Sequence, residues 1–101
     1  MNKQLIAGCL GQDARIGAGR DGNDFIAFSV AANSGYGEYK RTEWVDCIRF
    51  GKGAANMLPY LKQGKKVVVT GDCWSEEYQG THKRKLRVDS MELVSPKDET
   101  I

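Results

Sequence analysis

The sequence predicts an all-β fold, a small five-stranded Greek-key barrel with one short helix between the third and fourth strands. The chain has 101 residues, which is enough for one domain and not for two. Short runs of alternating apolar residues, separated by glycine-containing turns, indicate strands along the chain. Only one segment has helical spacing, and it follows the third run. Three strands, one helix and two strands is the order of the OB fold. An SH3-like barrel would lack this helix, and a ferredoxin-like fold would need two.

Three strands are expected before the helix, over residues 3–16, 24–33 and 41–50. Gly8 and Gly11 lie inside the first strand and mark expected bends or bulges. Asp21 and Gly22 form the tip signal of the turn that follows it. In the second strand the core-facing positions are Ile26, Phe28, Val30 and Ala32.

The helical candidate covers residues 51–63, where Ala54, Leu58 and Leu61 recur at helical spacing. Gly64 fits the position just after its last turn. Proline inside a helix costs about 3 kcal/mol, so Pro59 predicts a kink or two short turns.

The last two strands are expected over residues 65–78 and 82–94, joined by a hairpin turn at residues 79–81. Gly71 lies where the fourth strand must bend sharply to close a small barrel. We expect residues 1–95 to form the domain and residues 96–101 a short tail.

Composition argues against several classes of protein. No run approaches the ~18 apolar residues of a membrane span, and the N-terminal apolar stretch is too short for a signal peptide, so we expect a cytoplasmic protein without a membrane partner. Cys9, Cys47 and Cys73 are odd in number and far apart, and His82 is the only histidine. This pattern argues against a metal site or disulfide framework and predicts three small core residues in a reducing compartment.

The sequence contains no convincing motif for a cofactor or for catalysis. Residues 17–22 match the G-x-G-x-x-G pattern of dinucleotide-binding loops, but that loop opens a helix at once, and a strand is expected here. One histidine leaves a single candidate base for a Ser-His-Asp or Cys-His site, and no acidic residue or lysine is marked by a spaced motif. We therefore expect a protein that is not an enzyme and needs no cofactor.

Aromatic placement indicates a binding surface. Trp44 and Phe50 fall on one face of the third strand, and Trp74 and Tyr78 on one face of the fourth. Every base has a π-face, so stacking on such rings binds single strands without regard to sequence, at about 1–3 kcal/mol per base. Lysine and arginine beside the rings would hold the phosphates.

The competing interpretation is that Trp44 and Phe50 fill the core, as large aromatic residues more often do. Val45 and Cys47 on the opposite face can fill it instead. The face that carries Trp74 also carries Asp72 and Glu76, which predicts exposure. The basic run at residues 83–87 either contacts phosphates or forms a solvated strand edge where lysines discourage aggregation.

Six segments then follow one another in a distinctive order: Asn2-Lys3, residues 8–13, residues 28–31, Thr42-Glu43-Trp44, Phe50-Gly51-Lys52 and residues 60–64. Together they resemble the bacterial-type single-stranded DNA-binding protein family, SSB, over about residues 2–94. The resemblance implies sequence-independent binding and protection of single-stranded DNA in replication, recombination and repair.

The resemblance also implies site residues. The stacking positions are Tyr36, Trp44, Phe50 and Tyr78, with tryptophan usual in the family at the two tyrosine positions; the exposed Trp74 joins them as a candidate. Lys52 is the best-placed lysine for a phosphate. The other basic candidates are Lys3, Lys40, Arg41, Lys62, Lys83, Arg84, Lys85 and Arg87.

Assembly and partners are implied in the same way. The family forms homotetramers, with dimers as a second possibility, although Val45 stands where a histidine is common at the subunit interface. The loop at residues 34–40 is shorter than usual. The family's long tail ends in an acidic, hydrophobic tip that recruits replication and repair proteins, and residues 98–101 are either a vestigial tip or the tail is absent. Two other functions stay open: a protein-interaction module of a replication-restart complex, and an RNA-binding OB domain.

Overall fold

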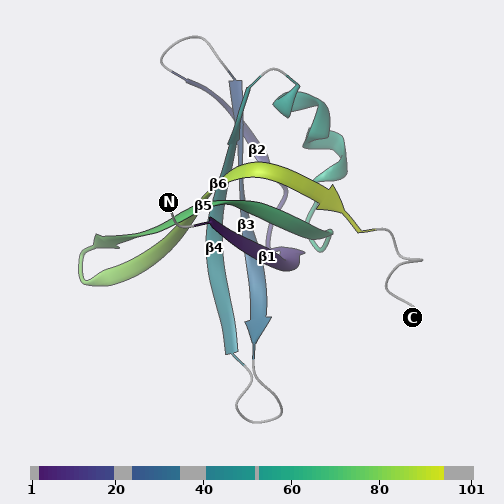
Figure 1. Cartoon of the computed structure of the whole chain (residues 1–101). Coiled ribbons are helices and arrows are strands. Elements are labelled where there is room, and N and C mark those ends of the chain that lie inside the picture. Colours follow the sequence, from purple (N-terminus) through teal and green to yellow (C-terminus); the bar gives the residue numbers. More distant parts are fainter. Residues whose placement is uncertain (1–2, 20–23, 35–40, 52, 95–101) are drawn as a thin grey trace.

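The computed structural model describes residues 3–19, 24–34, 41–51 and 53–94. It contains six strands and one short 3-10 helix (Figure 1). In chain order these are β1 (Lys3–Leu10), β2 (Arg15–Ala18), β3 (Asp24–Ser34), β4 (Arg41–Phe50), η2 (Ala54–Tyr60), β5 (Lys66–Tyr78) and β6 (Thr81–Leu93).

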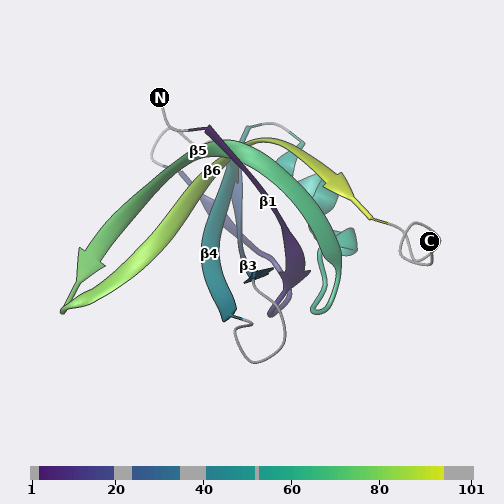
Figure 2. The ribbon, with the colours of Figure 1, turned by 60° about the horizontal axis from the view of Figure 1, so that its bottom comes forward.

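The strands form one sheet in the order β1-β5-β6-β4-β3-β2, and an additional pairing of β1 with β3 closes five of them into a ring. β4 and β6 run parallel, while the other pairs are antiparallel. β5 and β6 curve strongly across β4 (Figure 2). The prediction of an all-β fold with one helix between the third and fourth long strands is confirmed.

The first predicted strand is interrupted, whereas one continuous strand was expected over residues 3–16. β1 ends at Leu10, and β2 begins only at Arg15. Between them the backbone turns away from β5: Gly11 N–H donates to Ser29 O at 3.1 Å, and Ala14 N–H donates to Leu61 O at 2.8 Å. The chain thus leaves its pairing with β5 and next pairs with β3 as strand β2. Ala14 is buried where its N–H bonds to the residue that ends η2.

The core follows the alternation of the long strands. Ile26, Phe28 and Val30 are buried as predicted, and Ala32 packs half-buried at the edge of the core. Cys47 and Cys73 are also buried, but Cys9 is exposed. The prediction of a core role for Cys9 is wrong, because it alternates with the buried Leu10 and therefore faces outward from β1.

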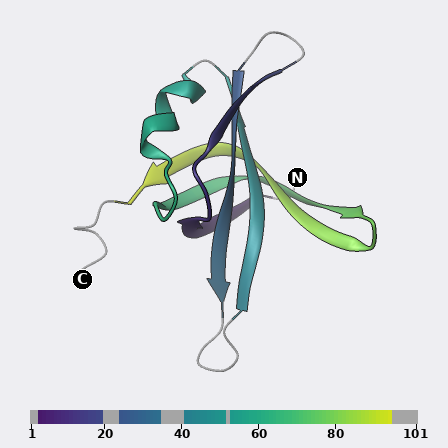
Figure 3. The same cartoon turned by 180° about the vertical axis from the view of Figure 1, so that it is seen from behind.

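The helix is shorter and tighter than the predicted segment over residues 51–63. It begins after Gly53, which adopts a left-handed conformation with φ of 88°, and it includes Pro59. A short 3-10 piece tolerates the missing N–H that would interrupt a longer α-helix. Ala54 and Leu61 are buried at its two ends, and Figure 3 shows it beside the upper part of β2 and β3.

A β-bulge bends β5 and β6 where they leave the ring. The pairing register shifts by one residue between Thr70 and Gly71. A Cβ at Gly71 would lie 1.9 Å from the carbonyl oxygen of Arg87, so only glycine fits there. Beyond the bend the two strands project as a ribbon, visible in Figures 1 and 2. It closes at Gln79 and Gly80, whose φ values of 50° and 78° are those of a type I′ turn. We call residues 74–85 the arm.

Candidate nucleic-acid interface

An open groove of about 810 Å³ runs between the arm and the outer face of β3 and β4. Its floor is made by outward positions of these two strands, namely Trp44 and the cross-strand pairs Ser29–Asp46 and Ala27–Ile48. Trp74, Glu76, Lys83 and Lys85 of the arm form one wall. The loop at residues 11–13, together with Arg15 of β2, forms the other.

Trp44 lies on the floor of this groove with 54% of its surface exposed. Val45 and Cys47 on the opposite face of β4 are buried, so the outward orientation predicted for Trp44 is confirmed and the core interpretation is wrong. A Cβ at Gly11 would lie 2.5 Å from Trp44 Cζ3, which places the ring directly against the backbone of this glycine. The loop therefore supports one side of the ring while the rest stays accessible.

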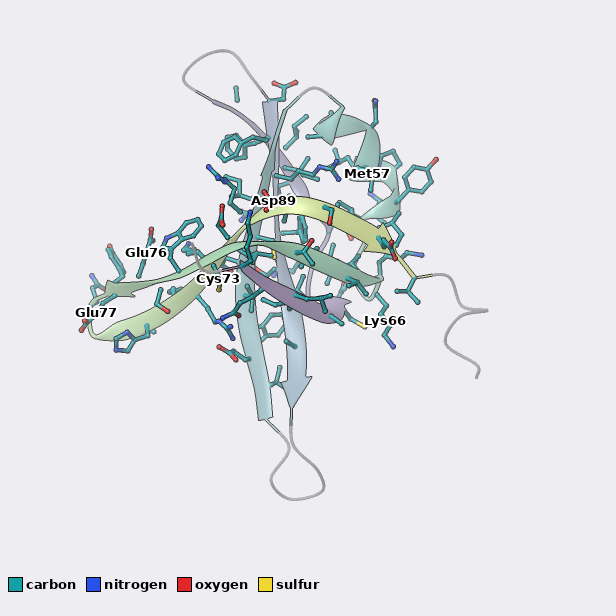
Figure 4. All side chains as sticks on the ribbon, viewed as in Figure 1. Met57, Lys66, Cys73, Glu76, Glu77 and Asp89 are labelled. Carbon is teal, nitrogen blue, oxygen red and sulfur yellow. The ribbon has the colours of Figure 1, made fainter. Side chains whose placement is uncertain are left out.

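Trp74 stands on the wall formed by the arm and is 41% exposed. Its Nε1–H donates to Glu76 Oε1 at 3.1 Å, which holds the indole against its own strand. Figure 4 shows Glu76 and the neighbouring Glu77 along the projecting ribbon. The groove thus has one accessible tryptophan on its floor and another on its wall.

A second aromatic pair lies farther along the same sheet face. Phe50 is 51% exposed and does not line the groove. It pairs in register with Phe25, and the two rings are tilted with centroids 5.7 Å apart. Sequence reasoning missed Phe25, although it alternates with Ala27 and Ser29 on the outward face of β3. Tyr78 is 68% exposed at the end of the arm, outside the groove, and Tyr36 lies outside the described residues.

Among the described residues that line the groove, acidic and basic side chains are equal in number. Its ionisable lining residues are Arg15, Lys83, Lys85, Asp13, Asp46 and Glu76. Lys85 Nζ lies 3.3 Å from Asp46 Oδ2, whereas Lys83 is exposed and forms no ion pair within the described part of the chain. Arg15 was not among the predicted residues, because the strand expected over residues 3–16 did not place it beside β3. Its register opposite Ala27 puts it at the groove.

Residues 1–95 match the sequence model of the Single-strand binding protein family. The chain belongs to this family. The resemblance noted in the sequence is thereby confirmed, and with it the OB fold.

Several relatives in the family cover the whole chain. The protein is 30% identical to the Single-stranded DNA-binding protein of Borreliella burgdorferi over 113 residues, covering 100% of this chain and 74% of the relative. It is 33% identical to the Single-stranded DNA-binding protein of Staphylococcus epidermidis over 105 residues, covering 97% and 79% of the two chains. Single-stranded DNA-binding protein 2 of Nostoc is 26% identical, with 98% and 83% covered.

In this member of the family, Lys3 and Arg87 are engaged outside the groove. Lys3 Nζ lies 3.2 Å from Asp72 Oδ1 and also pairs with Asp89, while Arg87 Nη2 lies 3.0 Å from Asp72 Oδ2. The bond to Asp89 raises the pKa of Lys3, and the bond from Lys3 lowers the pKa of Asp72. These cations thus already have carboxylate partners.

The other predicted cations either form ion pairs without lining the groove or lie outside the described residues. Arg84 Nη1 lies 2.9 Å from Glu43 Oε1, a contact that raises the pKa of Arg84, and it also donates to Gln4. Lys62 Nζ lies 3.7 Å from Asp13 Oδ2, with both side chains exposed. Neither Arg84 nor Lys62 lines the groove. Lys40 and Lys52 lie outside the described residues, as does the side chain of Arg41.

Neither a cluster of metal ligands nor a membrane-spanning helix occurs in the described part of this family member. Across residues 3–19, 24–34, 41–51 and 53–94, no three His, Cys, Asp or Glu side chains are grouped so that they could hold a metal ion. Over the same ranges no helix has the length and apolar character needed to span a bilayer.

Proposed function

We propose that this chain binds single-stranded DNA without strong sequence preference, with bases stacked on Trp44 and Trp74 and phosphates held by groove cations. The observation that carries the proposal is the pair of accessible tryptophans on the floor and wall of one groove. Each stacked base is worth about 1–3 kcal/mol, and any base can stack. The activity is one of binding and protection in replication, recombination and repair, without a chemical step.

The sheet face offers a path longer than one nucleotide. Trp44 and Phe50 are separated by six positions on β4, and a strand rises about 3.3 Å per residue, so about 20 Å separates them. We propose that the strand leaves the groove along this face and reaches the Phe25–Phe50 pair. Tyr36 and Tyr78 remain candidates for further bases.

Among the cations, Lys83 and Lys85 are the first candidates for phosphate contact, joined by Arg15. Lys83 is exposed in the groove, and no carboxylate of residues 3–19, 24–34, 41–51 or 53–94 forms an ion pair with it. Lys85 has three N–H donors, so it can hold a phosphate while it keeps its contact with Asp46. The other proposed contacts, in the described chain or beyond it, are Lys3, Lys40, Arg41, Lys52, Lys62, Arg84 and Arg87.

We propose that residues 1–95 form the DNA-binding domain and act in the cytoplasm as a homo-oligomer, a tetramer before a dimer. In support, Leu5, Ala7 and Cys9 face outward together from β1 and expose apolar surface. Light scattering with and without oligo-dT measures the assembly, and a monomer in both conditions contradicts it. Replication or recombination proteins are proposed as further partners.

Fluorescence titration with oligo-dT tests the DNA-binding proposal directly. The chain has two tryptophans, Trp44 and Trp74, and both line the groove. Stacked bases should quench them, and the affinity should fall as salt rises because bound phosphates release counterions. Trp74→Phe isolates the signal of Trp44. Unchanged fluorescence with no binding at low salt refutes the proposal.

A further inference from the structure

Asp46 occupies the middle of the groove floor. It lies on the outward face of β4 between Trp44 and Ile48, and all three residues line the groove. Its side chain is 38% exposed. A base that stacks on Trp44 therefore presents its edge near a carboxylate that is two positions, or about 7 Å, along the strand.

The carboxylate is held in place from both sides. Ser29 Oγ–H donates to Asp46 Oδ1 at 2.9 Å from the facing position on β3, and Lys85 Nζ lies 3.3 Å from Asp46 Oδ2. An ionised carboxylate can accept about four hydrogen bonds, so each oxygen keeps one free acceptor site. Asp46 is thus a fixed pair of acceptors with spare capacity in a site that binds bases.

The other two carboxylates of the groove are differently placed. Asp13 accepts a hydrogen bond from the backbone N–H of Gln63 at 2.8 Å and also faces Lys62. Its carboxylate thus ties the loop at residues 11–13 to the segment after η2. Glu76 accepts from Trp74 Nε1 on the opposite wall. Of the carboxylates in the described lining, Asp46 alone stands on the floor beside Trp44.

We propose that Asp46 gives the groove a local preference for guanine over thymine, an inference that rests on the proposed function. The Watson–Crick edge of guanine carries two adjacent donors, N1–H and N2–H, which match two carboxylate oxygens. Thymine has one donor, N3–H, between two carbonyl oxygens that repel the carboxylate. Cytosine and adenine offer one amino group beside a ring nitrogen acceptor, so their affinity for the carboxylate should lie between those of guanine and thymine. Unstacked bases are commonly read on this edge by hydrogen bonds.

Competition against a labelled oligo-dT of about 12 nucleotides, a length within the site size of one OB domain, tests the proposal. The competitors are oligo-dT, the same oligomer with one central guanosine, and that oligomer with inosine, which lacks the N2 amino group. We expect guanosine to raise the affinity about fivefold, near the lower limit for a two-bond contact between a side chain and a base. Inosine should lose most of this gain.

Two variants separate base recognition from charge. Asp46→Asn removes a negative charge from the groove, so it should raise the affinity for oligo-dT while bringing the guanosine-to-thymidine ratio close to one. Glu76→Gln removes the same charge from the wall formed by the arm and keeps an oxygen that can accept from Trp74 Nε1, so it should raise the affinity for both oligomers but keep the ratio.

The outcomes distinguish the two proposals. If the unaltered protein binds no oligomer, the proposed function is refuted. If it binds oligo-dT but does not favour guanosine, or if Asp46→Asn keeps the ratio, only the role of Asp46 is refuted.

Discussion

Replacing Gly11 by alanine should move the Trp44 ring without removing it. The added Cβ would lie 2.5 Å from Cζ3 and 2.6 Å from Cη2 of the indole. Carbon atoms pack best at about 3.5–4.0 Å, so the far edge of the ring must retreat by about 1 Å. The backbone of Gly11 lies outside the positive-φ region, so alanine can adopt its conformation.

The expected loss is in affinity more than in stability. A base stacked on Trp44 is worth about 1–3 kcal/mol. Trp44→Ala removes this stacking altogether, so its loss of affinity is the largest that displacement of the ring could cause. We expect Gly11→Ala to lose about 1 kcal/mol, or about fivefold in affinity for oligo-dT. Its free energy of unfolding should change by about 1 kcal/mol or less, because a half-exposed side chain can yield where buried backbone cannot.

Fluorescence titration at fixed salt measures the affinity, and urea unfolding shows whether the variant is equally folded. Gly17→Ala is the matched control, since its Cβ would meet the Phe25 ring at 2.4 Å, outside the groove. It should leave the quenching of Trp44 intact. Wild-type affinity and quenching in Gly11→Ala would refute the argument that the loop sets the stacking position of the ring.

Three further predictions concern the salt dependence of binding, thiol reactivity and the pH dependence of stability. Lys83→Ala should reduce the steepness of log affinity against log salt by about 0.7, the value for one phosphate on a single strand, whereas Lys66→Ala, whose exposed side chain lies outside the groove, should leave the steepness unchanged. In the folded protein a thiol reagent should spare Cys47 until the chain unfolds, because Cys47 is buried and this burial raises its pKa to about 12. The thiol of Cys47 ionises first in the unfolded chain, so the free energy of unfolding should fall as pH rises above about 9. Equal slopes for the two lysine variants, or labelling of Cys47 at the same rate before and after unfolding, would contradict these predictions.

The direction of side chains on the long strands could be predicted from the sequence. Alternation is a local property, so the burial of Val45 and Cys47 implied the exposure of Trp44 and Phe50. The need for glycine at position 71 was also predictable as a bend, although the clash with a backbone carbonyl that forbids any other residue was not.

The sequence could not predict the partners of each outward side chain. Arg15 reaches the groove because β2 pairs with β3, and Lys85 meets Asp46 because β6 runs parallel beside β4. Lys3 and Arg87 looked like free cations in the sequence, yet they share Asp72 on a neighbouring strand.

The sequence by itself determined the fold class and the face on which the rings lie, because period-two alternation and turn signals depend on neighbours along the chain. The family followed from the six segments that resemble it. Only the tertiary structure decided that the arm brings Trp74 to the wall beside Trp44, and that three carboxylates accompany three cations among the described residues of the groove. These facts depend on strand pairing between distant segments, which sets which side chains meet and which charges neutralise one another.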